Sequence, residues 1–524
     1  MAGMGEQTVI GAAGTIVEAF VTYNLQTDLT KPFDKYIACA LANQWFVDNL
    51  SLNTVTLTSG FSQRTFVKLP DGTYASPGDD SGTLSVNAGL FTYTSLTGQK
   101  LNFNSYGHIA TMVDPAGVTV SFTYDAYAKL LSVTNGMGRT LTLTYANSGN
   151  DNILASVSDG TGRSVSYTID GSANLTTVTD PNGKNWTYQY DQPGRMIKLF
   201  KPANPAVAVA TNVYDSLGRV QTQQDYQSNT WQYYFAGSRT EEVNPNGKSS
   251  ILYFNGLGKA VKSINLVGKI STAVFDGLGR MIKGTAPEGN SVELVFDSKN
   301  RVTQTTVHAK PGSGLADIVT SATYEATWGK LKTATDNMGR VTTLNYDAAN
   351  GNLLSVVSPV VTGLGSSTVS MTYNTRGQVL TVTAPDGIVT KNTFDATTEK
   401  LLSTVGDFGT GRLNLTANFG YDSVGNLTSV QDPRGFTSTA TFDVLRRVTQ
   451  TTTTAPWSFV TKFTFDDNSN TTKVERQTSD PANPWQTTQA TYTADGKVLT
   501  ATGPQGNVTS ITYDNLQRRC GTCQ

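Results

Sequence analysis

The sequence contains few cysteines, few histidines and few charged residues. It holds three cysteines and two histidines in 524 residues, and charged residues make up 15% of it, compared with about 25% in typical globular domains. Three cysteines are too few to cross-link a chain of this length, so packing and hydrogen-bond ladders must stabilise it. Two histidines are a poor supply for a histidine-based triad or metal cluster.

The charge balance and the apolar segments give no support for a nucleic-acid-binding, membrane-binding or membrane-spanning protein. Lysine plus arginine (39) nearly equals aspartate plus glutamate (40), and the net charge of -1 gives no electrostatic reason to expect a nucleic-acid or anionic-membrane partner. No apolar run reaches the roughly 18 residues of a helical span. The N-terminus lacks a basic region ahead of a continuous apolar core, so we expect neither a membrane span nor a signal peptide.

A repeated unit fills most of the chain instead. An aromatic residue, usually followed by aspartate, recurs with steps that are often 21 residues long, as from Phe103 to Tyr124 and from Phe275 to Phe296. Recurrence at a fixed period is the signature of a repeat architecture. The copies are Phe103, Tyr124, Tyr145, Tyr190, Tyr214, Phe275, Phe296, Tyr346, Tyr373, Phe394, Tyr421, Phe442, Phe465, Tyr492 and Tyr513, with weaker copies at Ile169, Phe235, Phe254 and Tyr324.

Each unit carries two turn signals. The first turn follows the aromatic residue and reads Asp-x-x-Gly-Arg, as in Asp215 to Arg219; the second reads Pro-x-Gly or x-x-Gly, as in Asp180 to Gly183. Aspartate or asparagine at the first position can accept a hydrogen bond from the backbone two residues on, and glycine at the fourth position accepts a positive φ. A turn of this kind followed by a bulge closes a β-hairpin, so we predict two strands per unit.

The segments between the turns favour strands. Apolar and polar residues alternate from Thr140 to Tyr145, which predicts a strand with one buried face. In the other half of the unit, Leu175 and Val178 are three positions apart and would face opposite sides of a regular strand. Either a bulge restores the register or both faces are partly covered. A short helix around Tyr36 to Val47 is the one helical pattern.

The number of strands predicts the architecture. About nineteen units give about 38 strands, and open twisted sheets rarely exceed about ten strands without curling. We therefore predict an all-β fold in which tandem antiparallel β-hairpins coil into a continuous, shell-like spiral sheet. The predicted domains are an irregular N-terminal segment at residues 1–60, which is a candidate cap, irregular β-hairpins at 61–102, and the repeat spiral at 103–524.

The unit (Tyr/Phe)-Asp-x-x-Gly-Arg-(Leu/Val) resembles the YD repeat of the RHS proteins, which also occurs in the shell subunits of Tc toxins and in teneurins. The resemblance extends from Leu101 to Asn515, and the segment from Phe66 to Tyr124 is similar to the irregular hairpins that precede the repeats in bacterial members. The residues expected to define the repeat are Tyr124, Asp125, Gly138, Arg139, Tyr190, Asp191, Gly194, Arg195, Tyr214, Asp215, Gly218, Arg219, Phe275, Asp276, Gly279, Arg280, Tyr346, Asp347, Tyr421, Asp422, Gly425, Tyr513 and Asp514.

The resemblance implies a function, partners and a location. RHS repeats form a spiralling sheet around a hollow shell, which often encloses a toxic C-terminal domain. It therefore implies a non-catalytic shell or scaffold segment of a bacterial system, secreted or at the cell surface. The implied partners are other segments or chains of the same shell, or an enclosed protein cargo. The repeats run to Asp514 without the core motif that ends RHS shells, so we expect a truncated gene, a fragment of a longer shell or a repeat-only protein.

The repeated side chains admit a binding and a structural interpretation. The turn arginines could bind an acidic partner or a glycan, but pairing with the repeat's own aspartate or stacking on its aromatic residue is favoured. The aromatic residues could form a carbohydrate platform, but a residue required in every unit is favoured as packing between hairpins. The turn arginines are Arg139, Arg163, Arg195, Arg219, Arg280, Arg340 and Arg412.

Cysteine and acidic motifs give weak signals for metals. Cys520 and Cys523 have CxxC spacing but no thioredoxin-like βαβ context. A zinc site would need Cys39 with His108 or His308 to converge from distant repeats. The segment from residue 466 to 470 imitates the start of a calcium loop, which fails at positions 471 and 477, so it is interpreted as a degenerate repeat turn.

Phosphate and catalytic motifs are equally weak. Gly247, Lys248 and Ser249 have the ending of a phosphate loop, but Glu242 stands where the first glycine belongs. We therefore predict no catalytic residue, no cofactor and no metal site. Two alternatives to a scaffold stay open: a hydrolase that uses turn carboxylates, and a cell-surface adhesin or carbohydrate-binding protein. In the second, exposed aromatic residues such as Trp186, Trp231 or Trp328 would line a concave face.

Overall fold

The computed structural model describes residues 40–41, 44, 53–59, 62–77, 81–146, 153–363, 365–453 and 458–523. Ala40, Leu41 and Gln44 of the helix predicted around residues 36–47 are helical, and the rest of that segment lies outside the described residues, as does most of the candidate cap at 1–60. The chain divides into two compact units. The first is Met1–Gly107 with Ser298–Asn300, and the second is His108–Asp297 with Arg301–Gln524.

The first unit contains short antiparallel strands around a small core. Strands β1 to β3 form one sheet, and β4 pairs with β5, which pairs with β6. Phe66, Leu84 and Tyr93 are buried together, with Tyr93 packed edge-on against Phe66. The strands are β1 (Thr54–Ser59), β2 (Ser62–Lys68), β3 (Tyr74–Ala75), β4 (Thr83–Asn87), β5 (Leu90–Thr94) and β6 (Lys100–Phe103).

The second unit is built from hairpins alone among its described residues. Its strands are β7 (Ile109–Val113), β8 (Thr119–Tyr124), β9 (Leu130–Thr134), β10 (Thr140–Tyr145), β11 (Leu154–Ser158), β12 (Ser164–Ile169), β13 (Leu175–Thr179), β14 (Asn185–Gln192), β15 (Arg195–Phe200), β16 (Ala208–Tyr214), β17 (Val220–Asp225), β18 (Thr230–Ala236), β19 (Arg239–Val243), β20 (Ser249–Phe254), β21 (Ala260–Ile264), β22 (Ile270–Phe275), β23 (Met281–Thr285), β24 (Ser291–Phe296) and β25 (Val302–His308). They continue as β26 (Ile318–Tyr324), β27 (Leu331–Thr335), β28 (Val341–Tyr346), β29 (Leu353–Val357), β30 (Thr368–Tyr373), β31 (Val379–Thr383), β32 (Val389–Phe394), β33 (Leu401–Gly406), β34 (Leu415–Tyr421), β35 (Leu427–Gln431), β36 (Thr437–Phe442), β37 (Val448–Thr453), β38 (Phe459–Phe465), β39 (Thr471–Gln477), β40 (Trp485–Tyr492), β41 (Val498–Thr502), β42 (Val508–Tyr513) and β43 (Arg519–Cys523).

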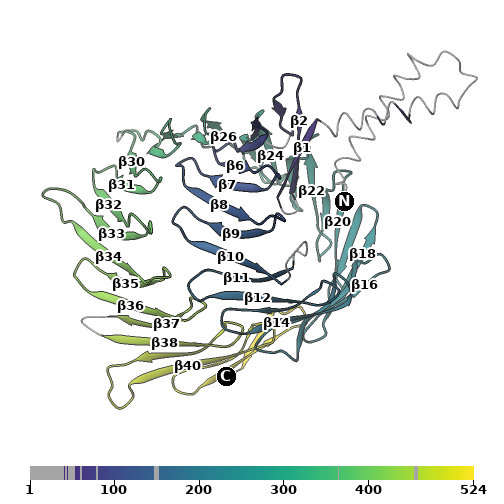
Figure 1. The fold of residues 1–524 in the computed structure, drawn as a ribbon, viewed down its shortest axis with the longest axis vertical. Coiled ribbons are helices and arrows are strands. Elements are labelled where there is room, and N and C mark those ends of the chain that lie inside the picture. Colours follow the sequence, from purple (N-terminus) through teal and green to yellow (C-terminus); the bar gives the residue numbers. More distant parts are fainter. Residues whose placement is uncertain are drawn as a thin grey trace, which may run out of the picture. The chain divides into compact units, whose positions relative to one another are not determined.

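Every strand from β7 to β43 pairs antiparallel with the next strand in the sequence. The pairing of β7 with β8, of β24 with β25 and of β42 with β43 all follow this rule. Successive hairpins can be followed in Figure 1 as the colour runs from blue through green to yellow. The predicted all-β fold of tandem antiparallel hairpins in one continuous coiled sheet is confirmed. The sheet is long and open, because its strands pair only with their sequence neighbours.

A bulge resolves the irregular half of the repeat. Val178 pairs with Tyr167 and Leu175 pairs with Ile169, and the register shifts between these two pairs. Because Tyr167 and Ile169 are two positions apart, they share a face of β12, so Leu175 and Val178 share a face of β13. The bulge is therefore present, and both faces of β13 are also partly covered, because all five of its residues are half-buried. It recurs at the repeat aromatic residue in most hairpins, as at Tyr214 and Phe275.

The second unit has few fully buried side chains. Among the described residues, Ala494 is its only buried hydrophobic residue, and most strand residues are half-buried. On the more exposed face, the residue before the repeat aromatic is often threonine, and its hydroxyl meets a hydroxyl on the next strand, as in Thr144 with Ser156 and Thr491 with Thr500. Such cross-strand pairs stabilise a sheet without apolar burial. These hydroxyl pairs explain how the sheet keeps a polar, solvent-facing surface although the sequence has few charged residues.

Candidate functional site

The first turn of each unit is organised by its aspartate. Asp215 Oδ1 accepts hydrogen bonds from the backbone N–H groups of Leu217 and Arg219, both at 2.9 Å. The Gly218 N–H donates to the Asp215 carbonyl, and Gly218 has a φ of 76°. This is the turn chemistry that the sequence predicted. The segment from residue 466 to 470 has the same bonds, so its interpretation as a repeat turn is confirmed.

The turn arginine connects its own aspartate to the next unit. Arg219 Nε donates to Asp215 Oδ2 at 2.8 Å, while its guanidinium carbon lies 4.7 Å from the centre of the Phe235 ring. Arg195, Arg219 and Arg280 therefore make both contacts weighed from the sequence. One correction applies: the ring belongs to the following unit, because the strand that carries it lies beside the turn. Equivalent cation–ring pairs are Lys129–Tyr145, Arg195–Tyr214, Arg280–Phe296, Arg301–Tyr324, Lys330–Tyr346, Lys400–Tyr421, Arg447–Phe465 and Lys497–Tyr513.

The repeat tyrosine satisfies a backbone carbonyl in the unit before it. The ladder between β9 and β10 ends at the pair Ser132–Thr142, so it does not reach Leu130. The Tyr145 hydroxyl donates to the Leu130 carbonyl at 2.9 Å instead, and burial raises the pKa of this hydroxyl. The same bond is made by Tyr124, Tyr190, Tyr214, Tyr324, Tyr346, Tyr373, Tyr421, Tyr492 and Tyr513.

In a unit that has phenylalanine in place of the repeat tyrosine, another side chain can make the bond to the backbone carbonyl. Phe394 has no hydroxyl, and Asn392 Nδ2, two positions earlier on β32, donates to the Val379 carbonyl at 3.0 Å. Val379 begins β31, so it occupies the place that Leu130 has in the unit of Tyr145. The tyrosine and the asparagine therefore serve one structural purpose.

The residues expected to define the repeat fall on two edges of the sheet. Tyr214, Phe275, Tyr346, Tyr421 and Tyr513 end strands at the first turn, and Tyr190 lies two residues before the end of β14. In or beside those turns are Asp191, Gly194, Arg195, Asp215, Gly218, Arg219, Asp276, Gly279, Arg280, Asp347, Asp422, Gly425 and Asp514. Gly138 and Arg139 lie in a second turn, which begins at Asn135, on the opposite edge. The first turn after Tyr124 and Asp125 carries Ala128, with a φ of 62°, in the glycine position.

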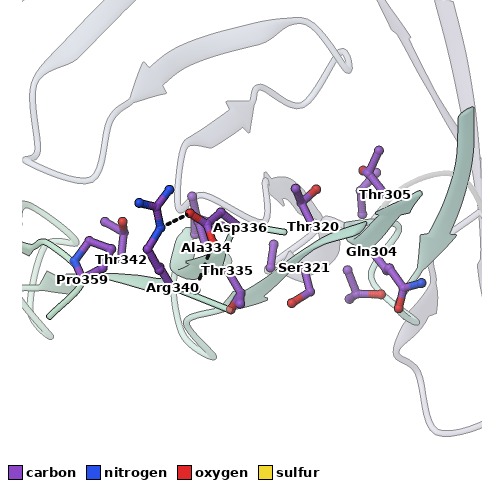
Figure 2. A pocket seen from close by; sticks show the side chains of 14 residues that line it. Gln304, Thr305, Thr320, Ser321, Ala334, Thr335, Asp336, Arg340, Thr342 and Pro359 are labelled. Atoms are coloured by element: carbon purple, nitrogen blue, oxygen red, sulfur yellow. Dashed lines mark hydrogen bonds and ion pairs between the residues drawn. The ribbon is translucent and has the colours of Figure 1, made fainter. Parts of the chain in front are cut away.

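One hollow lies beside a second turn (Figure 2). It measures about 340 Å³ and is lined by hydroxyl, amide and small apolar side chains such as Thr320, Ser321, Gln304 and Ala334. Arg340 is the cation at its rim, and its Nε donates to Asp336 Oδ2 at 2.7 Å. The charge of this arginine is therefore neutralised within its own turn.

Turns that are far apart in the sequence meet within the second unit. Second turns between residues 135 and 229 lie against first turns between residues 422 and 518, and we call this contact the coil seam. Arg139 reaches the Val424 carbonyl, Arg446 reaches Asp159 Oδ2 at 3.4 Å, and Lys201 Nζ donates to the Asp495 carbonyl. Partners across the seam are separated by 265 to 294 residues. The sheet therefore returns to its own edge after one coil.

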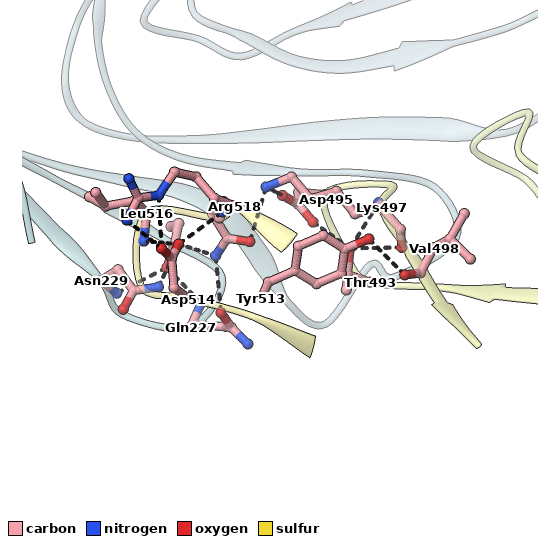
Figure 3. Close-up of polar contacts among 12 residues, drawn as sticks. Gln227, Asn229, Thr493, Asp495, Lys497, Val498, Tyr513, Asp514, Leu516 and Arg518 are labelled. Atoms are coloured by element: carbon pink, nitrogen blue, oxygen red, sulfur yellow. Dashed lines mark hydrogen bonds and ion pairs between the residues drawn. The ribbon is translucent and has the colours of Figure 1, made fainter. Parts of the chain in front are cut away.

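The coil seam uses two positions where the repeat normally has glycine. Gln517 and Arg446 occupy the fourth position of first turns, with φ values of 62° and 63°. Gln517 Nε2 donates to Asp225 Oδ2 and to Gln227 Oε1, and Figure 3 shows this end of the seam beside Asn229. An L-residue in this conformation is costly. Both long side chains offset that cost with a contact to the other coil.

Trp186, Trp231 and Trp328, which were expected to be exposed on a glycan-binding surface, are half-buried. Lys201 lies over the ring of Trp186. The Trp328 indole N–H donates to the Ala348 carbonyl at 3.3 Å, and the ring packs closely over Gly351. Neighbouring hairpins contact Trp186 and Trp328 in this way, which a search for aromatic residues in a sequence does not reveal. Trp231 lines a hollow of about 230 Å³.

Hydrogen bonds lower the pKa values of several turn carboxyls, such as Asp215 and Asp276. The backbone and side-chain hydrogen bonds from Arg219 lower the pKa of Asp215, and the side-chain bond from Arg280 lowers that of Asp276. A general acid in glycoside hydrolysis needs the reverse shift, a raised pKa.

Among the described residues, no group of three or more His, Cys, Asp or Glu side chains is placed to hold a metal ion. Cys520 is an exposed free thiol on β43, and Cys39 lies outside the described residues.

No helix in the described part of the chain combines the length and hydrophobicity needed to cross a bilayer.

The fold and its turns define a class: a tandem β-hairpin repeat protein whose single sheet coils. Residues 102–276 match the Teneurin YD-shell family and residues 421–455 match the RHS Repeat family. The resemblance to RHS and YD-repeat proteins is thereby confirmed. A search of curated proteins found no match.

Solved structures share the fold at low sequence identity. The chain is similar to the crystal structure of TcdB2-TccC3-Cdc42 (14% identity, TM-score 0.54), covering 99% of this chain and 32% of that one. It is also similar to the Photorhabdus luminescens Tc holotoxin pore (14%, TM-score 0.51), covering 90% and 30%. A third similar structure is TcdB2-TccC3 without its hypervariable C-terminal region (14%, TM-score 0.50), covering 92% and 30%. The chain spans about a third of the length of these structures.

Proposed function

We propose that this chain is a length of shell wall, a non-catalytic scaffold of a secreted or cell-surface bacterial system of the RHS type. The observation that carries the proposal is the coil seam. A sheet that bonds to its own edge, as Arg446 does to Asp159, is a wall that can enclose a volume. The matches to the YD-shell and RHS families and the fold shared with the Tc toxin structures support it.

The partners of such a wall follow from its geometry. Other segments or chains of the same shell would extend it, because a sheet of hairpins can add a further hairpin at its edge strand. The enclosed partner would be a protein cargo. Within this proposal, residues 1–60 are a candidate cap, residues 61–102 precede the repeats and residues 103–524 form the wall.

Electron microscopy of the purified chain tests the proposal. We expect thin, curved particles with solvent on both faces of the wall. Compact particles with no internal space would overturn the shell function. A glycan array with the same sample tests the adhesin alternative: specific binding to one class of glycan would favour that alternative over a scaffold.

A further inference from the structure

A cavity of about 690 Å³ lies on the coil seam, and its lining differs from that of the other hollows. Arg139 and Arg163 come from second turns of one coil, and Arg446 comes from a first turn of the other. The volume is within the range of about 300–1,000 Å³ that is usual for small-molecule sites. Three guanidinium groups from two coils therefore face one space.

Two of these arginines fall outside the pairing that neutralises other turn arginines. Arg340 and Arg219 bond to the aspartate that begins their own turn. The turn of Arg139 begins with Asn135, which carries no charge. In the turn of Arg446, Asp443 is already paired with Arg447 at 2.6 Å.

The available carboxylates do not balance the cations at this place. Asp159 Oδ2 lies 3.3 Å from Arg163 and 3.4 Å from Arg446, so one carboxylate is shared by two guanidinium groups. Lys400 adds a fourth positive charge. Burial and the charges of Arg139 and Arg446 lower the pKa of Lys400, and Asp422 only partly opposes them. Four cations against two carboxylates leave an excess of two positive charges.

Arg163, which lines the cavity, also has one donor without a partner. The Nε of Arg163 is buried and makes no hydrogen bond within the protein. A buried donor without an acceptor is costly, and guanidinium groups recognise phosphate and sulfate oxygens well.

We propose that this cavity binds a small anion carrying two phosphate or sulfate groups, held by Arg139, Arg163 and Arg446. Because the three arginines come from two coils, the anion joins the coils and stabilises the seam. This site is independent of what the shell encloses.

Isothermal titration with inorganic pyrophosphate tests the site directly. Arg446→Gly removes the guanidinium and installs the residue that the repeat normally has at this turn position, so the turn should fold. The matched control is Gln517→Gly, which makes the corresponding change at a seam turn outside the cavity. We expect binding by the unmodified chain, at least about tenfold weaker binding by Arg446→Gly, and unchanged binding by Gln517→Gly.

A second variant and a second probe complete the test. Arg139→Gln should also weaken pyrophosphate binding at least about tenfold, and amide hydrogen exchange at residues 422–426 should slow when pyrophosphate binds to the unmodified chain. A doubly sulfated disaccharide, titrated in parallel, distinguishes a phosphate ligand from a sulfated glycan. The proposal is overturned if neither anion binds, or if Arg446→Gly and Arg139→Gln both bind pyrophosphate as tightly as the unmodified chain does.

Discussion

Gln517 Nε2 lies 2.5 Å from Asp225 Oδ2, although 292 residues separate them in the sequence. Asp225 begins a second turn, and its Oδ1 accepts hydrogen bonds from the backbone of Gln227 and Asn229. One oxygen of this carboxylate therefore closes its own hairpin, and the second accepts hydrogen bonds both from Asn229 Nδ2 in the same turn and from Gln517 of the other coil. This double use links local turn chemistry to the coiling of the sheet.

Replacing Gln517 with glycine separates these two effects. Glycine relieves the strain of a φ of 62°, worth roughly 1–2 kcal/mol, but it removes both bonds to the other coil. We expect the turn at 514–518 to keep its amide protection while the turn at 225–229 exchanges faster. Hydrogen-exchange mass spectrometry measures both. Equal protection of residues 225–229 in both proteins would show that the seam bond is unimportant.

Removing a repeat hydroxyl should weaken one hairpin boundary. Tyr145→Phe deletes the bond to the Leu130 carbonyl, at a cost of about 1 kcal/mol. Faster exchange at β9 and β10 and a lower unfolding midpoint in urea are the expected results. Tyr127→Phe is the control, because Tyr127 is exposed in the turn between β8 and β9. The role given to the hydroxyl is wrong if the two variants behave alike.

Two glycines with similar φ values should differ in their tolerance of a methyl group. Gly351 and Gly339 have φ values of 71° and 76°. A Cβ on Gly351 would lie 2.8 Å from Trp328 Cδ2, whereas a Cβ on Gly339 would meet open space. Gly351→Ala should therefore cost about 1–3 kcal/mol more than Gly339→Ala. Urea unfolding followed by tryptophan fluorescence measures the difference, and equal losses would contradict the close packing of Trp328.

The loop after β25 should depend on pH through His308. The bond to Asp317 at 2.7 Å raises the pKa of His308, and Glu293 at 3.5 Å adds to the rise. A raised pKa means that this interaction stabilises the fold below the ordinary value of 6.5 and is lost as pH rises through the folded pKa.

An NMR titration should therefore place the pKa of His308 above its ordinary value of 6.5. As pH rises above 6.5, thermal stability of the unmodified chain should fall by more than that of His308→Asn. A His308 imidazole that titrates at or below its ordinary pKa would refute this assignment.

Local features of this fold could be predicted from the sequence, and long-range ones could not. Asp215 and Gly218 determine their turn within five residues, so the hairpins and the all-β class followed directly. The spacing of Leu175 and Val178 left open a bulge or partial cover of both faces. The sequence could not choose, because a bulge is defined by how two strands pair. Arg219 was expected on its own unit's ring, yet it lies over Phe235, because its neighbour in space is the next hairpin.

The coil seam left only a faint signal in the sequence. The interval between coils is set by twist accumulated over many strands, and no local motif encodes it. Arg446 and Gln517 stand where glycine is usual, and a long polar side chain in that position was the one available sign of a distant contact. Trp186 and Trp328 were misjudged for the same reason, since they contact residues of neighbouring hairpins.

The distance between Gln227 and Gln517 tests the coiled sheet most directly. Spin labels at these two positions, with the native cysteines replaced by serine, report it by pulsed electron paramagnetic resonance. In the coiled sheet the two residues are in hydrogen-bond contact, so we expect a narrow distribution at short distance. An uncoiled ribbon would separate their strands by about 120 Å, at about 4.8 Å per strand, and the absence of a short distance would contradict the account.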